Sequence, residues 1–177
     1  MFNGIKDKLK RKSGAKFLKA ELSKPKAEVK RKKGITSIGC IVDLDKFENS
    51  NLFYEFIEEF SLRPNAVKII GYKSFYDKNS PYSIPVFSGK DLGWNGNIEN
   101  SYALEFLSRD YDMLVNYYNE ENLLLELMTV KTRARVNVGF VEVDKVYNDL
   151  ILDTPMNNFK VFKTELKKYL RVLNEIE

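Results

Sequence analysis

Two aspartates stand one residue apart at the end of an apolar run, Asp43 and Asp45 after residues 38–42. Paired carboxylates at the end of a buried strand can hold Mg²⁺ while one of them attacks a phosphoryl group. Two later acids, Asp149 and Asp153, would then serve as distal metal ligands. This pattern is the strongest catalytic candidate in the chain, and it predicts phosphoryl-transfer chemistry at one edge of a sheet.

The pair resembles the opening motif of haloacid-dehalogenase-type phosphatases, Asp-x-Asp-x-Thr/Val, with Phe47 at the Thr/Val position of this chain. The resemblance implies a small metal-dependent phosphatase that uses Asp43 and Asp45. It is the alternative function here, because the motif comprises only two residues.

Other kinds of catalytic site find little support. The chain has no histidine, which excludes His-dependent triads and His metal ligands. Its one cysteine, Cys40, lies in the apolar run 38–42, where a buried small side chain is expected rather than a nucleophile. No glycine-rich phosphate loop follows a strand. We therefore expect no cofactor and, in the preferred interpretation, no metal and no catalytic residue.

Charge is distributed unevenly along the chain. Residues 1–33 hold 13 Lys and Arg against three acids, a balance of +10, whereas the other residues hold 16 against 22, a balance of −6. Lysine and arginine neutralise phosphates without reading base sequence. We therefore predict that a basic arm anchors an acidic domain to RNA. The predicted contacts are Lys6, Lys8, Lys10, Arg11, Lys12, Lys16, Lys19, Lys30, Arg31, Lys32, Lys33, Arg133 and Arg135.

Two other interpretations of the arm remain open. Lysine-rich termini are common as solvated tails that serve solubility. An anionic membrane surface is a further possible partner, to which a polybasic segment contributes about 1 kcal/mol per charge. Apolar anchors in the arm are few and it has no tryptophan, which favours RNA. Arg133 and Arg135 could likewise form a solvated edge that discourages strand pairing.

The apolar spacing in the arm predicts two short amphipathic segments. The first contains Phe2, Ile5 and Leu9 and is interrupted at Ser13-Gly14. The second runs through Phe17, Leu18 and Leu22, and Pro25 ends it. We expect this arm to be mobile or bound to a partner.

The elements that would position these residues follow a strand-helix-strand pattern. Residues 113–118 and 135–143 predict two strands, joined by a helix with leucines at 123, 124 and 127. An earlier unit combines a strand over 35–44, a helix over 52–60 and a strand over 67–72. A short helix at 102–107, a brief strand at 150–152 and a helix over 158–176 complete the pattern. Parallel strands require such crossovers.

The segment 74–100 has no clear periodicity and contains three glycines and the only tryptophan. Long structureless loops inside compact domains are usually functional or mobile. We expect its part 87–97, with Lys90 and Trp94, to lie near the carboxyl ends of the strands and to form a pocket with Asp43 and Asp45. Burial of Trp94 against the domain is favoured over a ligand-stacking role.

Two resemblances cover larger parts of the chain. The strand that starts Tyr111-Asp112, the leucine-rich helix and the strand with Arg135 and Gly139-Phe140 are similar to the N-terminal half of heptosyltransferase-like GT-B glycosyltransferases. This implies a remnant glycosyltransferase-like enzyme as part of the alternative function. The basic start, the loop at 87–94 and the C-terminal helix resemble an uncharacterised family of small cytoplasmic proteins of Bacteroidota, which implies a fold but no activity.

These observations predict a three-layer Rossmann-like α/β domain over residues 34–177, with about five mostly parallel strands, preceded by a basic arm over residues 1–33. No apolar run approaches the roughly 20 residues that span a membrane, and no signal-peptide core is present. We expect a cytoplasmic, non-enzymatic RNA-associated protein, ribosome-bound or active in ribosome assembly. Oligomeric state does not follow from the sequence.

Overall fold

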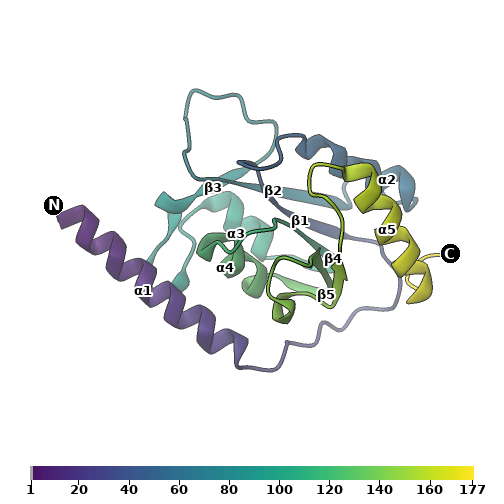
Figure 1. The fold of residues 1–177 in the computed structure, drawn as a ribbon, viewed down its shortest axis with the longest axis horizontal. Coiled ribbons are helices and arrows are strands. Elements are labelled where there is room, and N and C mark those ends of the chain that lie inside the picture. The colour runs from purple at the N-terminus through teal and green to yellow at the C-terminus, as the bar shows by residue number, and fades with distance from the viewer. Residues whose placement is uncertain (1) are drawn as a thin grey trace.

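A computed structural model describes residues 2–177 and shows a six-stranded, entirely parallel sheet. The strand order is β3-β2-β1-β4-β5-β6, in which the direction of winding reverses between β1 and β4 (Figure 1). This is the order of Rossmann folds. The strands are β1 (Ile38–Asp43), β2 (Val67–Lys73), β3 (Val86–Ser88), β4 (Asp110–Tyr117), β5 (Arg133–Phe140) and β6 (Leu150–Leu152).

Helices cover both faces of the sheet, which makes three layers. One face carries η1 (Ser50–Tyr54), α2 (Glu55–Glu59) and α5 (Phe159–Val172); the other carries α1 (Phe2–Leu22), α3 (Ser101–Leu107) and α4 (Leu123–Lys131). Short 3₁₀ turns η2 (Gly89–Asp91), η3 (Trp94–Gly96) and η4 (Lys145–Tyr147) lie in the connections. The predicted α/β fold class is therefore confirmed.

Each face has its own hydrophobic core. Phe53, Phe162 and Tyr117 are fully buried in the core beneath α2 and α5, where their rings meet edge to face. Leu127 and Phe106 belong to the core beneath α3 and α4. The central strands are buried on both faces, which explains why their sequences are nearly continuous apolar runs rather than alternating ones.

The central strand-helix-strand unit is formed by β4, α4 and β5, as the sequence predicts. Asn122 caps α4, because its side-chain oxygen accepts hydrogen bonds from the amides of Leu124 and Leu125 at 3.0 and 3.3 Å. The helix expected over 52–60 is shorter and begins as the 3₁₀ turn η1. The loop 74–100 is less irregular than predicted, since it contributes the edge strand β3, which has only three residues.

The expected break at Ser13-Gly14 is wrong: α1 is one continuous helix of 21 residues. Gly14 is a point of close contact between α1 and the body, because a Cβ there would lie 3.7 Å from the Cα of Gly96 in η3. Ser13 accepts a hydrogen bond from the amide of Asn95 at 3.1 Å. A small residue inside a helix can therefore mark a close packing contact instead of an end. The side chain of Phe2 lies outside the described residues.

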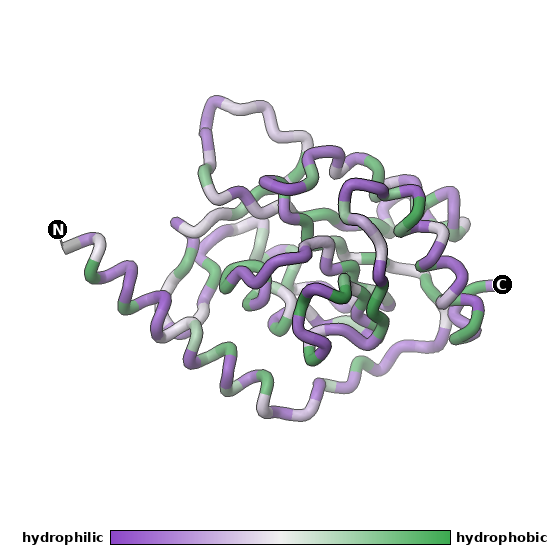
Figure 2. Tube along the Cα trace, in the orientation of Figure 1, coloured by the Kyte–Doolittle hydropathy of each residue, from purple (hydrophilic) through white to green (hydrophobic). Residues whose placement is uncertain are grey.

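Beyond this contact, α1 has two different parts. Leu18 is buried and Phe17 half-buried against the α4 face, whereas residues 3–9 are all exposed. Figure 1 shows the start of α1 projecting past the edge of the domain, and Figure 2 shows that α1 is mostly hydrophilic. After α1, residues 23–37, here called the strap, run along the amino edge of the sheet to β1.

Candidate functional site

Asp43 and Asp45 lie at the carboxyl end of β1, as expected, but in different surroundings. Asp43 is 7% exposed, and its Oδ1 accepts a hydrogen bond from the Asp45 amide at 3.0 Å. Burial raises the pKa of the Asp43 carboxyl above its ordinary value. Asp45 is more exposed and accepts a hydrogen bond from the Ser74 amide at 2.8 Å. The two carboxylates are thus held largely by neighbouring backbone.

The two distal acids do not join this pair. Asp149 accepts a hydrogen bond from the Asn137 amide at 2.7 Å, in the middle of β5, and pairs with Lys26. Asp153 follows β6, which is separated from β1 by two strands. At about 4.8 Å between strands, its backbone is roughly 14 Å from that of Asp43. Their expected role as metal ligands beside Asp43 is therefore wrong. Within residues 2–177 no group of three or more His, Cys, Asp or Glu is placed to hold a metal ion.

The crevice at which the winding reverses is bridged by an ion pair. Lys46, just past β1, contacts Glu120, just past β4, at 2.8 Å. Below it, the ring of Phe47 packs 4.8 Å from that of Tyr117. Rossmann-like folds place ligands at this point. Here an aromatic contact and an ion pair occupy it.

The predicted RNA contacts fall into three groups. The first group consists of seven cations on α1, which the structure places on a single helix; apart from half-buried Lys10 they are exposed. Among the described residues, none of them forms an ion pair with a carboxylate. We call these seven side chains the α1 cations. They are Lys6, Lys8, Lys10, Arg11, Lys12, Lys16 and Lys19.

The second group contains arginines that are already paired within the protein. Arg31 in the strap contacts Asp112 at 2.6 Å, Arg133 contacts Asp110 at 2.6 Å, and Arg135 contacts Glu175 at 2.6 Å. Arg133 is more than half exposed, whereas Arg135 is largely buried. The third group, the strap lysines Lys30, Lys32 and Lys33, is exposed. Sequence reasoning missed the carboxylate partners because they are distant in the chain.

Asp112 is the centre of the strap's attachment. It is 2% exposed and accepts hydrogen bonds from the Thr36 amide at 2.8 Å and hydroxyl at 2.6 Å, and from the Ser37 amide at 3.0 Å, besides Arg31. Burial acts to raise the pKa of the Asp112 carboxyl, but the hydrogen bonds from Arg31 and Thr36 outweigh it and hold the pKa below its usual value. The strap is therefore an integral part of the domain edge.

The predicted loop residue Lys90 meets the α1 cations at one hollow. A cavity of about 330 Å³ lies at the carboxyl edge near the ends of β2 and β3, lined by Lys10, Arg11, Lys90 and Ser74 among others. The loop therefore leaves the sheet at the same edge as Asp43, as expected. The five described cavities do not include Asp43 or Asp45 in their linings, which differs from the pocket predicted for this loop.

Trp94 is more exposed than the sequence analysis predicts. Its exposed fraction is 44%, so it does not act as a fully buried plug. The loop is instead held by Leu92, Ile98 and the backbone hydrogen bond between the Gly93 amide and the Asn97 carbonyl at 2.8 Å.

A comparison with protein families gives a match over most of the chain. The model of a family of unknown function, DUF6913, matches residues 10–173. The chain belongs to the DUF6913 family. The DUF6913 match begins at Lys10, close to the point where α1 first touches the body, and it includes the strap. No curated protein and no solved structure matches the chain significantly. In the described part of the chain, no helix is long and apolar enough to cross a membrane.

Proposed function

We propose that this protein is a non-enzymatic RNA-associated protein. It binds ribosomal particles or their assembly intermediates, and α1 binds the RNA backbone. The observation that carries the proposal is the set of α1 cations, which have no carboxylate partner among the described residues. Unpaired lysines and arginines on a rigid helix contribute to phosphate binding without first breaking an internal ion pair.

The geometry of α1 supports a backbone contact rather than base recognition. From Lys6 to Lys19 the helix rises about 20 Å, so its cations can follow several successive phosphates. The hollow with Lys10, Arg11 and Lys90 extends this basic surface onto the body. The arginines Arg31, Arg133 and Arg135 contribute less to this surface, because each is already held by a carboxylate.

The proposal is tested by removing charge from α1 without changing its packing. In the triple variant Lys8→Gln, Lys12→Gln and Lys16→Gln, all three side chains are exposed. We expect weaker cosedimentation with ribosomal particles at low salt and a salt dependence of RNA affinity whose slope falls by about 2. A matched control replaces Lys78, Lys145 and Lys160, exposed lysines of the body, by glutamine.

Equal binding by the two triple variants would contradict the proposal. Binding to vesicles of anionic phospholipid that equals or exceeds binding to ribosomal particles would point to a membrane surface instead. Point substitutions are preferable to deleting residues 1–33, because the deletion also removes Leu18 from a core and Arg31 from Asp112.

A further inference from the structure

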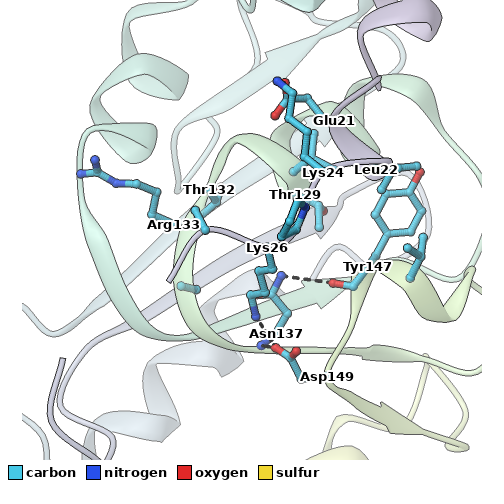
Figure 3. A pocket seen from close by; sticks show the side chains of 15 residues that line it. Glu21, Leu22, Lys24, Lys26, Thr129, Thr132, Arg133, Asn137, Tyr147 and Asp149 are labelled. Carbon is cyan, nitrogen blue, oxygen red and sulfur yellow. Dashed lines mark hydrogen bonds and ion pairs between the residues drawn. The ribbon is translucent and has the colours of Figure 1, made fainter. Parts of the chain in front are cut away.

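A cavity of about 380 Å³ lies between the strap and the body, away from the α1 cations and from Asp43. Its walls come from the end of α1 and the strap, from the end of α4, and from β5 and η4 (Figure 3). This volume is at the lower end of the range for small-molecule sites. The cavity has no counterpart in the sequence predictions.

Asn137 in β5 lines this cavity and is 7% exposed. Its Nδ2 donates a hydrogen bond to the Tyr147 carbonyl oxygen at 3.1 Å, which fixes the orientation of the amide because the opposite orientation would place two oxygens together (Figure 3). Its Oδ1 is buried and has no hydrogen-bond partner among the described residues. A buried acceptor without a donor destabilises the folded state. Among the described residues nothing donates to Asn137 Oδ1, so a hydrogen-bond donor for this atom has to come from outside the protein.

The charged side chains around the cavity are already paired. Lys24 pairs with Glu21 and Lys26 with Asp149, while Arg133 contacts Asp110 at 2.6 Å. No unmatched charge among these groups would attract a charged ligand. The uncharged part of the wall combines apolar side chains with hydroxyl and amide groups. The apolar ones include Leu22, Pro25, Val130, Ala134 and Val146, and the polar ones are Thr129, Thr132, Asn137 and Tyr147. These walls favour an uncharged ring.

The Lys26 side chain lines the cavity at a solvent-exposed part of its wall. Its Nζ contacts the same Asp149 oxygen that accepts the Asn137 amide hydrogen bond, so Lys26 lies close to Asn137. The Lys26 and Asp149 side chains are 45% and 47% exposed, and exposed ion pairs contribute little to stability. Displacing Lys26 to open a path to Asn137 is therefore inexpensive.

We propose that this cavity binds an uncharged planar ring with an N–H donor, the chemistry of the pairing edge of a uracil or guanine base, and that the N–H donates to Asn137 Oδ1. Two sources supply such a ring: a free nucleoside, and an unpaired base of an RNA strand, which single-strand readers commonly bind by its edge. The proposal does not rest on the α1 cations, which contact phosphates in the proposed function.

The test uses the full chain and measures amide chemical shifts and calorimetric affinity for uridine and guanosine. We expect saturable binding, with shifts at Asn137, Ala134 and Tyr147. The analogue 3-methyluridine lacks the ring N–H and should bind at least tenfold more weakly than uridine. Failure of both uridine and guanosine to bind, or equal affinity of uridine and 3-methyluridine, would overturn the proposal.

Two kinds of variant locate the site. Asn137→Ala should weaken uridine binding at least tenfold. Because Asn137 is in a buried strand, Ala27→Trp provides a surface alternative: Ala27 is exposed and lines the cavity, so a tryptophan there should block entry. Ala20→Trp, at an exposed position of α1 outside the cavity lining, is the matched control and should bind as the wild type does. Unchanged uridine affinity in both Asn137→Ala and Ala27→Trp would place the nucleoside elsewhere.

The affinity of an oligouridylate distinguishes a free nucleoside from an RNA base as the source of the ring. It also tests the Asn137 site and the α1 interface separately. If the ring comes from RNA, the oligomer should bind more tightly than uridine and should produce the same shifts at Asn137. The variant Lys8→Gln, Lys12→Gln and Lys16→Gln should then weaken the oligomer and leave uridine affinity unchanged. If uridine binds but the triple variant of α1 binds every RNA as tightly as the wild type, the proposed α1 interface is refuted and the Asn137 site is retained.

Discussion

At the scale of single residues, the pKa values of two buried aspartates, Asp43 and Asp112, shift in opposite directions. Burial raises the pKa of Asp43, and the opposing effects of the Asp45 amide and of Lys46 do not reverse the increase. Asp112 is buried still more deeply, yet Arg31 and Thr36 lower its pKa. Asp112 therefore contributes to stability at neutral pH, whereas the charge on Asp43 opposes folding there.

Replacing Arg31 with methionine should lower the free energy of unfolding by about 2 kcal/mol, because Asp112 would keep its charge but lose its charge-assisted hydrogen bond. Urea unfolding at pH 7 measures this. Adding Asp112→Asn to the same chain should restore part of the loss, since the buried charge is then absent. A decrease in the free energy of unfolding below about 0.5 kcal/mol, the usual range for surface substitutions, would mean that the Arg31–Asp112 pair does not stabilise the fold.

Replacing Asp43 with asparagine should stabilise the protein at pH 7. The folded-state pKa of Asp43 is raised above its unfolded value, so ionising it costs folding free energy as pH rises, and asparagine removes that cost. Near pH 3 the substitution should have little effect. Thermal unfolding at both pH values measures the difference. The same variant addresses the alternative function: a phosphatase that depends on Asp43 would lose its metal-dependent turnover.

At the scale of elements, α1 combines a structural half with an exposed half. Leu18 and Phe17 pack on the α4 side, and the ring of Phe17 lies beneath the Lys131 ammonium group at 4.2 Å. Gly96 permits this approach, since its φ is +73° and a Cβ would lie 2.9 Å from both Phe17 and Leu127. The exposed residues 3–9 include Lys6 and Lys8, neither of which forms an ion pair among the described residues.

Leu18→Ala should destabilise the protein by about 2–5 kcal/mol, the cost of truncating a buried leucine. Ile5→Ala, on the same helix but 57% exposed, is the matched control and should change stability by less than about 0.5 kcal/mol. Chemical denaturation of both variants provides the comparison. Equal stability of the two would show that α1 does not dock in solution.

The elements that could be predicted from the sequence are those with strong periodicity. The unit β4-α4-β5 and the helix α5 follow directly from apolar spacing, and Asn122 marks the start of α4. The edge strand β3 was missed because three residues carry too little pattern. The continuity of α1 was missed because Gly14 suggests a break, whereas its contact with Gly96 depends on residues 82 positions later. For the same reason, the Asn137 cavity could not be predicted, since it joins the strap to β5.

At the scale of the whole molecule, distant parts of the chain meet at the amino edge of the sheet. Glu175, two residues from the C-terminus, accepts a hydrogen bond from the Gly34 amide at 2.9 Å and pairs with Arg135. The Arg135 hydrogen bond lowers the pKa of Glu175, burial opposes this, and the Gly34 amide adds to the lowering. The strap, β5 and the C-terminus are thus joined by one carboxylate.

Stability should therefore fall in acid. Because the pKa values of Asp112 and Glu175 are lowered on folding, their contribution is fully present above the ordinary carboxyl values of about 4 and is lost as pH falls through the folded-state values. Circular dichroism during acid titration measures the loss. Glu175→Gln should reduce stability at pH 7 and flatten this acid dependence; an unchanged acid slope would exclude Glu175 as a contributor.

The contact between Gly34 and Glu175 also bears on the order of events during synthesis. The basic helix and the strap are translated before their partners Gly96, Asp112 and Glu175, which follow their contact residues by 82, 76 and 141 positions. Domains assemble as their segments leave the ribosome. The strap therefore cannot complete its attachment until Glu175 has been synthesised, so docking of the strap is a late step in the assembly of this domain.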